Sequence, residues 1–377
     1  MTMTGTHLLL SRRAFLHAST AAVVLGLRCR PSLKLAISAD AGYDDVLAAL
    51  QTTDIDYPGG ANHAPMAIEA LHALGASEAR IVEWTKHYSE KLELAETGAA
   101  IPPDDRAAAI GKLDKHAGLI AGYEEQLATT DYKTLIAREL PRLLSGTAAG
   151  WHGIIRLAHG VYALEENRSD VRLREVAIGL GGFAAWSQPL PGVPGARAVS
   201  GYDVLTALEA TPLVPAAQRV GGNIYGRMAA LKGRSDFTDA VETVDLAALP
   251  VTDAVNGLVS LAARIFVNEG KANIALIHAV TGTAALRPLL PLLSEADQRA
   301  AVGHAYQAVA AAYASQGTAG GTAAIAGPSR SADAIYAESI AAEEEHVFKV
   351  AITARREAEY QDPSDVLTAL ESWAKAV

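Results

Sequence analysis

Five histidines lie in mostly apolar stretches of the sequence that have helical character. They are His63 in NHAPM, His152 and His159 in GWHGIIRLAHGVYAL, His278 in LIHAVTG, and His346 in EEEHVFKVA. A buried imidazole costs free energy unless it forms a hydrogen bond or binds a metal, so each of these rings needs a partner. One such histidine is more often a hydrogen-bonded core residue. Five of them favour a metal site built from inward side chains of facing helices, where imidazole suits iron, zinc or copper.

The stretch 150–164 carries His152, Arg156 and His159 at positions i, i+4 and i+7, on one face of an otherwise apolar helix. The two histidines are about 10.5 Å apart along the axis, so both can bind one ion only if the ion lies midway between them. One of the two could instead face the substrate. Arg156 would repel a cation, so we expect it to pair with a carboxylate or a substrate oxygen. Together with Thr281, it is a candidate for orienting substrate oxygens.

Lys349 follows His346 by one helical turn, on the same face. A buried ammonium group is costly, and burial lowers its pKa. A neutral lysine amine can react with carbon dioxide to give a carbamate, whose oxygen is an anionic metal ligand. On spacing alone, an ordinary ion pair with Glu345 or Asp333 is the better interpretation.

Composition predicts an all-α fold with a large core. The chain has 377 residues, of which 50% are hydrophobic, 20% charged and 6% aromatic, and alternating β-branched residues are scarce. The formal charge of -10, with no run of Lys and Arg in the body of the chain, argues against a nucleic-acid or anionic-membrane partner and favours a small neutral or aromatic substrate. The single cysteine, Cys29, excludes an intrachain disulfide and a thiolate metal cluster.

Apolar periodicity and helix-breaking residues divide the chain into helices without an internal repeat or a domain linker. We expect the metal-site candidates on four of them: a helix starting at Asn62, the central helix, an apolar segment over 273–290 interrupted at 281–283, and a long helix over 332–360. The other expected helices cover 43–51, 77–96, 135–144, 171–186, 202–209, 215–231, 253–268, 295–314 and a short segment after Pro363.

The N-terminal 39 residues have the pattern of a twin-arginine export signal. Arg12 and Arg13 in SRRAFL precede an apolar run over 21–27, and no acidic residue occurs before Asp40. The run is too short for a stable membrane anchor. The alternative is an over-extended start or a disordered tail on a cytoplasmic protein. We therefore predict a leader over 1–39 and a helical domain over 40–377.

Four blocks of this domain, in order, resemble the questin oxidase-like family. The blocks are NHxPMxxEALxxLG from Asn62, WHGIIRLAHG from Trp151, LIHAVTGTAALRPLLP from Leu276, and EHVFK from Glu345. The resemblance implies a non-haem iron held by histidines and a carboxylated lysine, in an enzyme that opens an anthraquinone ring by a Baeyer-Villiger-like oxidation. The residues that it implies as ligands are His63, one or both of His152 and His159, His278 and His346, with Lys349 as the modified lysine in place of the ion pair.

We therefore expect an iron-dependent oxygenase that uses O2 as co-substrate and acts on a polycyclic aromatic or polyketide-type substrate. NADPH stays open as the reductant, although GLGGFA at 179–184 has no preceding strand and is not a dinucleotide-binding fingerprint. Two other functions stay open. One is a metal-free helical protein that binds a hydrophobic small molecule, and the other is a zinc hydrolase, although HExxH and GxSxG are missing. The sequence does not indicate the oligomeric state.

Overall fold

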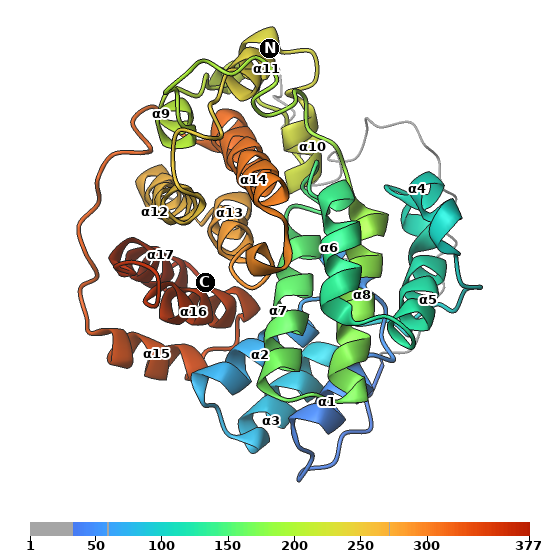
Figure 1. The fold of residues 1–377 in the computed structure, drawn as a ribbon. Coiled ribbons are helices and arrows are strands. Elements are labelled where there is room, and N and C mark those ends of the chain that lie inside the picture. Colours follow the sequence, from blue (N-terminus) through green and yellow to red (C-terminus); the bar gives the residue numbers. More distant parts are fainter. Residues whose placement is uncertain (1–32, 59, 271) are drawn as a thin grey trace, which may run out of the picture. The chain divides into compact units, whose positions relative to one another are not determined.

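Helices make up almost all of the regular structure. The computed structural model describes residues 33–58, 60–270 and 272–377. In that part of the chain it has 17 α-helices, four short 3-10 helices and one two-stranded hairpin, and Figure 1 shows their arrangement. The all-α prediction is therefore confirmed. The twin-arginine pattern at Arg12 and Arg13 lies outside the described residues.

The first half of the chain supplies a small hairpin and eight helices. The elements are α1 (Tyr43–Leu50), β1 (Asp56–Tyr57), β2 (Gly60–Ala61), α2 (Ala64–Leu74), α3 (Glu78–Ser89), α4 (Arg106–Ala109), α5 (His116–Leu127), α6 (Tyr132–Leu143), α7 (His152–Glu166) and α8 (Asp170–Trp186). The start of α2 is set by Asn62, whose Oδ1 accepts a hydrogen bond from the backbone N–H of Ala64. It ends at Gly75, which adopts a left-handed conformation with φ 91°.

Helices α7 and α8 pack along each other near the middle of the described chain (Figure 1). Their close approach depends on Gly179, the first glycine of the GLGGFA segment, which lies inside α8. A Cβ atom at Gly179 would lie 2.9 Å from Cα of Leu157 on α7. Gly179 therefore serves helix packing.

The second half forms the rest of the bundle. Its helices are α9 (Val204–Glu209), α10 (Ile224–Ala229), α11 (Ser235–Glu242), α12 (Val251–Glu269), α13 (Ile274–Ala284), α14 (Glu295–Gln316), α15 (Ala332–Ala341), α16 (Glu345–Glu357) and α17 (Ser364–Ala374). In Figure 1, α13 lies beside α12 and α14, and α16 lies beside α17. The four short 3-10 helices are Pro103–Asp105, Leu113–Lys115, Ala216–Gln218 and Leu290–Leu292.

Three helix predictions were wrong. The single helix expected over 215–231 is a 3-10 helix at Ala216–Gln218 and a separate short helix, α10, with non-helical chain at 219–223 between them. The single helix expected over 332–360 is two helices, because the chain leaves the helical conformation at 342–344. There the side chain of Glu344 accepts hydrogen bonds from the backbone N–H groups of His346 and Val347 and so begins α16. The break expected at 281–283 does not occur, because α13 continues through it. The hydroxyl of Thr283 accordingly donates to the carbonyl of Ala279, one turn earlier in the same helix.

The segment before α7 has an unusual backbone. Ala148, Ala149, Gly150 and Trp151 all have positive φ angles, of 24°, 51°, 66° and 72°. The left-handed region costs an L-residue roughly 1–2 kcal/mol. This strained turn directly precedes His152, and strain of this kind is often found at functional sites.

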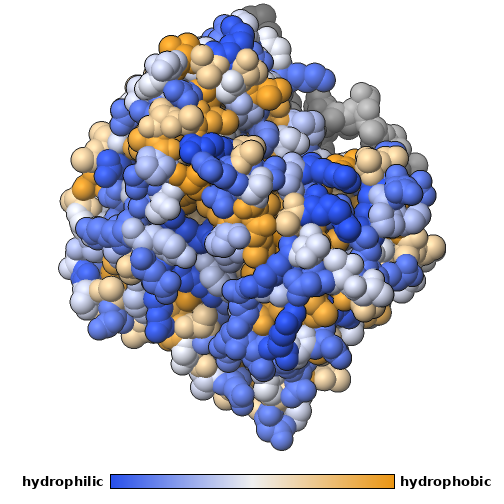
Figure 2. All heavy atoms as spheres, viewed as in Figure 1, coloured by the Kyte–Doolittle hydropathy of each residue, from blue (hydrophilic) through white to orange (hydrophobic). Residues whose placement is uncertain are grey.

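No helix in the described ranges is both long enough and apolar enough to cross a membrane. On the face shown in Figure 2, polar side chains are interspersed with smaller apolar areas. The first described residues pack against the core. They include Leu33, Leu35 and Ile37, which fall within the predicted leader.

Candidate metal centre

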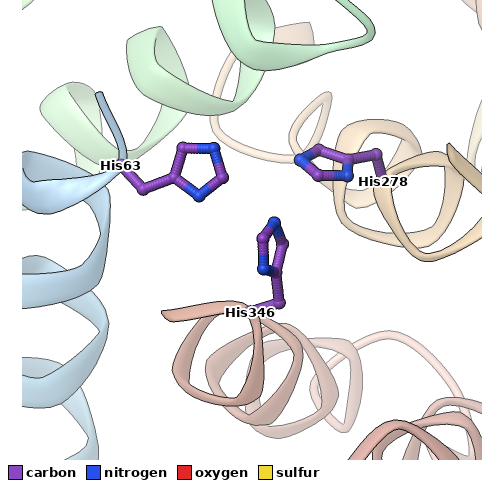
Figure 3. Close-up of side chains that lie close together, drawn as sticks. All are labelled: His63, His278 and His346. Carbon is purple, nitrogen blue, oxygen red and sulfur yellow. The ribbon is translucent and has the colours of Figure 1, made fainter. Parts of the chain in front are cut away.

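Four histidine side chains from four parts of the chain meet at one buried point. His63 precedes α2, His152 begins α7, His278 lies within α13, and His346 is in the first turn of α16. Nε2 of His152 lies 2.7 Å from Nε2 of His63 and 3.1 Å from Nε2 of His278. Figure 3 shows His63, His278 and His346 around a common centre, and one nitrogen from each lies within 4.8 Å of the others. We call these four residues the histidine cluster.

In three of the rings, Nδ1 points away from the centre of the cluster and donates a hydrogen bond. This hydrogen bond determines which ring nitrogen carries the proton. Nδ1 of His152 donates to a backbone carbonyl three residues earlier, at 2.5 Å, and Nδ1 of His278 donates to one four residues earlier, at 2.6 Å. Nδ1 of His346 donates to Oε1 of Glu344. Carbonyl and carboxylate oxygens only accept, so Nδ1 carries the proton in each neutral ring and Nε2 carries a lone pair. Three lone pairs therefore belong to the inner atoms of the cluster.

These inner nitrogens cannot satisfy one another. Nε2 of His152 and Nε2 of His278 are both acceptors, yet they lie 3.1 Å apart. Nε2 of His346 is buried and has no hydrogen-bond partner among the described residues. Two nitrogens that bind one ion at about 2.1 Å lie about 3.0 to 3.4 Å from each other. The distance between His152 and His278 lies in this range, whereas the distance of 2.7 Å between His63 and His152 is shorter. The three rings whose nitrogens can surround one ion are those of His63, His278 and His346, and His152 lies against two of them.

The pKa values favour the neutral rings that metal binding requires. Burial lowers the pKa of His152 to about 3, and the positive charge of Lys349 adds to this effect. The same causes hold the pKa values of His63 and His278 well below the ordinary value. Burial and Lys349 also lower the pKa of His346 despite the nearby carboxylates, so the cluster is neutral at ordinary pH.

Lys349 lies at the edge of the cluster. It is fully buried, and its Nζ lies 3.3 Å from Nδ1 of His63. Burial lowers the pKa of the amine to about 8, although nearby carboxylates oppose the shift. In the part of the chain that the structure describes, no carboxylate oxygen lies within 4.0 Å of Nζ. The ion pair with Glu345 or Asp333 that spacing alone favours is therefore not formed.

His63 has two available tautomers. Its Nδ1 lies 3.3 Å from Nζ of Lys349 and 3.3 Å from Oε1 of Glu345. If Nδ1 donates to Glu345, Nε2 of His63 carries a lone pair, which is the fourth on the inner side of the cluster. If Nδ1 accepts from Lys349, Nε2 carries the proton and can donate to His152. The main chain is held at this residue, because the backbone N–H of His63 donates to the hydroxyl of Tyr88 at 3.1 Å.

His159 lies outside the histidine cluster. Its Nδ1 donates to Oε2 of Glu69 at 2.5 Å, and the same carboxylate is bound by Arg356. Burial opposes ionisation of Glu69, but the charges of Arg356 and His159 outweigh it and lower the pKa of Glu69 to about 2. Of the two histidines on α7, the geometry therefore brings His152 to the cluster and His159 to a carboxylate.

The two residues expected to orient a substrate have protein partners. Nε of Arg156 donates to Oε1 of Glu175 at 2.8 Å, so Arg156 has the carboxylate partner that the sequence offered as one alternative. Its Nη1 has no hydrogen-bond partner among the described residues. The hydroxyl of Thr281 lies 3.4 Å from the carbonyl oxygen of His278, one turn earlier on α13, and lines a small cavity beside His159.

Three residues of the site were not singled out from the sequence. Glu344 accepts from His346 and, at 2.7 Å, from the indole N–H of Trp373. Glu69 binds His159 in the same way. Both carboxylates could have been found from the sequence. Glu344 is at a helix-capping position, and Glu69 is the single carboxylate in a mainly apolar helix. Trp373, which lies 27 residues after His346, could not.

Comparison with family models and with curated proteins finds no match for the chain. The described structure by itself defines a class of protein: an all-α protein with a buried histidine cluster that can bind a metal ion.

Proposed function

We propose that the protein is an iron-dependent oxidoreductase, an oxygenase of questin oxidase-like type whose iron is held by His63, His152, His278 and His346. The observation that carries the proposal is the convergence of inner nitrogens with lone pairs: Nε2 of His152 and Nε2 of His278 face each other without a proton between them, and Nε2 of His346 has no hydrogen-bond partner among the described residues. A hydrogen-bonded core of histidines would place a donor opposite each acceptor. The same observation argues against a metal-free binding protein.

The number of donors favours iron over zinc. Zinc sites are almost always four-coordinate, and catalytic ones keep three protein ligands. Four imidazoles and an oxygen from a modified Lys349 would offer up to five donors, more than a zinc site takes. Iron in this site would supply the activation of dioxygen for the oxidation of a polycyclic aromatic substrate, and nothing in the proposal needs a bound nicotinamide.

Lys349 fits the role of a carboxylated lysine. Its amine is fully buried beside His63, and the described residues give it no ion pair. The neutral amine reacts with carbon dioxide to form an N–C bond and releases one proton, which leaves an anionic carbamate. Starting from the ammonium form, two protons are released. The carbamate would sit among neutral imidazoles, where it offsets the charge of a cation that four histidines leave uncompensated.

The surrounding residues hold the ligands in place. Glu344 fixes the ring of His346, and Trp373 fixes Glu344 in turn. The strained turn before α7 supplies the carbonyl of Ala149 that orients His152. Orientation of ligands by such outer hydrogen bonds is general in metal sites.

The cavities near the site have little space for a ring in this conformation. A cavity of about 20 Å³ near the start of α7 is lined mainly by apolar residues, among them Trp151, Ile154 and Phe183, and by no residue of the histidine cluster. A second cavity of the same size lies on the His159 side. Each has room for about one water, so a polycyclic substrate has to widen one of them on binding.

The test is elemental analysis of protein expressed with iron and carbon dioxide available, compared with the variants His278→Ala and His346→Ala. The proposal expects close to one iron per chain in the wild type and little in either variant. His72→Ala, which removes a half-buried histidine outside the cluster, is the control and should keep the metal. Wild-type protein without metal, or iron retained in both cluster variants, would remove the metal centre from consideration.

Zinc in place of iron is a separate outcome. Stoichiometric zinc that is lost with His278 or His346 would keep the cluster as a metal site but overturn the oxygenase. Turnover of hydroxyanthraquinones under oxygen, followed by mass spectrometry for addition of oxygen atoms, then tests the reaction class in the iron-loaded protein.

A further inference from the structure

A second polar site lies beside the histidine cluster and is built from the same helices. The helices that carry or follow His63, His152 and Lys349 each supply another residue about two turns farther along. These residues are Glu69 on α2, His159 on α7 and Arg356 on α16. Six or seven residues correspond to about 10 Å along a helix. The three helices therefore run in the same direction here and hold two sites, one above the other.

Glu69 and His159 form a dyad with one free nitrogen. Both side chains are buried, with 4% and 7% exposure, and Nδ1 of His159 donates to Oε2 of Glu69 at 2.5 Å. Arg356 binds both oxygens of the carboxylate and stacks over the ring of Tyr162, 3.6 Å from its centroid. With the proton on Nδ1, Nε2 of His159 carries the lone pair on the opposite edge of the ring. Among the described residues, no hydrogen bond uses this Nε2.

The histidine ring borders a small cavity. Its volume of about 20 Å³ is enough for one oxygen atom of a water or a hydroxyl group. The cavity walls come from α7, α13, α16 and the turn after α13. The polar residues among them are His159, Tyr162, Thr281, Arg287, Thr353, Arg356 and Glu357. Because Thr281 and Thr353 lie one turn beyond His278 and Lys349, the cavity is next to the cluster.

We propose that His159, held by Glu69, is the general base that takes a proton from a substrate hydroxyl group entering this cavity. The identity of the substrate rests on the proposed function, whereas the dyad does not. The O–H bond breaks, its electron pair stays on oxygen, and a new N–H bond forms at Nε2. The resulting imidazolium is stabilised by the Glu69 carboxylate, as in other carboxylate and histidine pairs. No oxidant or reductant takes part in this step.

The substrate then carries an ionisable hydroxyl, phenolic or enolic. The oxygen of this hydroxyl lies about 10 Å from the substrate atom that reaches the cluster. Removing the proton gives an electron-rich ring, which is the form that oxidation favours. Thr281 and Tyr162 are placed to contact the same oxygen.

The charges around His159 favour a ring that is neutral before the transfer. Burial lowers its pKa and Glu69 raises it, while Arg356 and Lys349 on α16 lower it further. The remaining charged groups of the cavity, Arg287 and Glu357, neutralise each other in an ion pair of 2.7 Å. From α8, Glu175 is directed to Arg156.

The experiment uses 4-nitrophenol, a small phenol whose absorbance reports its ionisation, bound to the purified protein in the metal state in which it is isolated. The pH midpoint at which the bound probe ionises is measured for the wild type, His159→Gln and Glu69→Gln. We expect the midpoint to rise by about one pH unit or more in both variants, which is the loss of roughly 1.4 kcal/mol of stabilisation of the phenolate. His72→Gln, on the same helix as Glu69 but at the surface beside Glu166, should leave the midpoint unchanged.

Three results would overturn the inference. One is a wild-type protein that does not bind the probe, and another is an unchanged midpoint in both variants, which would mean that a metal or solvent ionises the phenol. The third is loss of metal from His159→Gln, measured by elemental analysis, which would make His159 part of the metal site. If Glu69→Gln fails to fold because Arg356 loses its partner, His159→Gln decides. A wild type without metal but with the expected shift removes the iron proposal and leaves the dyad standing.

Discussion

The two histidines of α7 differ in what their Nδ1 atoms bind, although they lie on one face of one helix. His152 donates to the backbone carbonyl of Ala149, whereas His159 donates to the carboxylate of Glu69. Both rings are similarly buried and both have a lowered pKa. The neutral backbone partner leaves His152 among other imidazoles, where a cation is needed. The anionic partner lets His159 accept a proton without any cation.

The two histidines differ in the charge of the group that accepts the hydrogen bond from Nδ1. We infer that this charge separates a metal ligand from a proton acceptor. A carboxylate behind an imidazole stabilises the protonated ring, and a backbone carbonyl does so much less. Within the cluster, His346 combines both properties, because its carboxylate partner Glu344 supports a nitrogen that faces the other histidines. The predictions below test how far this distinction holds.

The largest effect is expected from exchanging the two histidines of α7 for glutamine. His152→Gln removes an inner nitrogen of the cluster and should reduce bound metal to less than about a tenth of the wild-type content, since glutamine offers a hard oxygen in place of imidazole. His159→Gln should bind as much metal as the wild type. Elemental analysis of both proteins, purified in parallel, is the measurement. Equal losses in the two variants would contradict the assignment of different roles.

A smaller effect is expected where the carboxylate supports a ligand. Glu344→Gln keeps the hydrogen bond to His346 but removes the negative charge, so metal affinity should fall about 10- to 100-fold. Competition with a chelator measures the change. Glu343→Gln is the matched control, because the neighbouring side chain is exposed and pairs with Arg80 at the surface. An affinity that is the same in both variants would show that the charge behind His346 does not matter.

A third histidine with a carboxylate partner has a raised pKa. Nε2 of His116 lies 3.1 Å from Oδ1 of Asp54, and this hydrogen bond raises the pKa of His116 to about 9 although burial opposes it. A raised pKa means that the protonated form is stabilised by folding. The contribution is therefore complete below about pH 6.5, the pKa in the unfolded chain, and is lost as the pH rises through 9.

Replacing His116 by glutamine should accordingly lower the free energy of unfolding by about 2 kcal/mol at pH 6 and by little at pH 10. Urea denaturation at the two pH values measures it. Asp54→Asn should give the same pattern, because the pKa of Asp54 is lowered by the same pair despite its burial, and the pair is intact above the ordinary range of the carboxyl. A loss independent of pH in both variants would mean that the ion pair is not formed.

The fold class and most helices could be predicted from the sequence because apolar periodicity and capping residues are local signals. The break between α15 and α16 was missed because 332–360 has no Gly or Pro at 342–344, and the capping role of Glu344 is visible only once the turn is formed. The continuous α13 was missed for the opposite reason. Thr281, Gly282 and Thr283 disfavour a helix locally, but the helix is buried and its hydroxyls bond within it.

The site could be predicted in part. Polar residues on apolar helices mark a buried site, which is how His278 and Lys349 were found. The sequence cannot say which of two histidines on one face reaches a cluster, because that depends on how α7 packs against α2 and α16. Spacing also suggested a pair between Lys349 and Glu345, although Glu345 in the fold lies beside Nδ1 of His63.

The smallest predicted effect concerns the turn that positions His152. Ala149 has a φ of 51°, which strains an alanine but not a glycine. Ala149→Gly should therefore raise the free energy of unfolding by a few tenths of a kcal/mol, because relief of strain slightly exceeds the added flexibility of the unfolded chain. At the other end of α7, Ala163 is buried in regular helix, and Ala163→Gly should lower stability by about 1 kcal/mol. Urea denaturation of both variants measures the contrast. If Ala149→Gly destabilises the protein as much as Ala163→Gly, the turn is not strained, and His152 owes its orientation to packing alone.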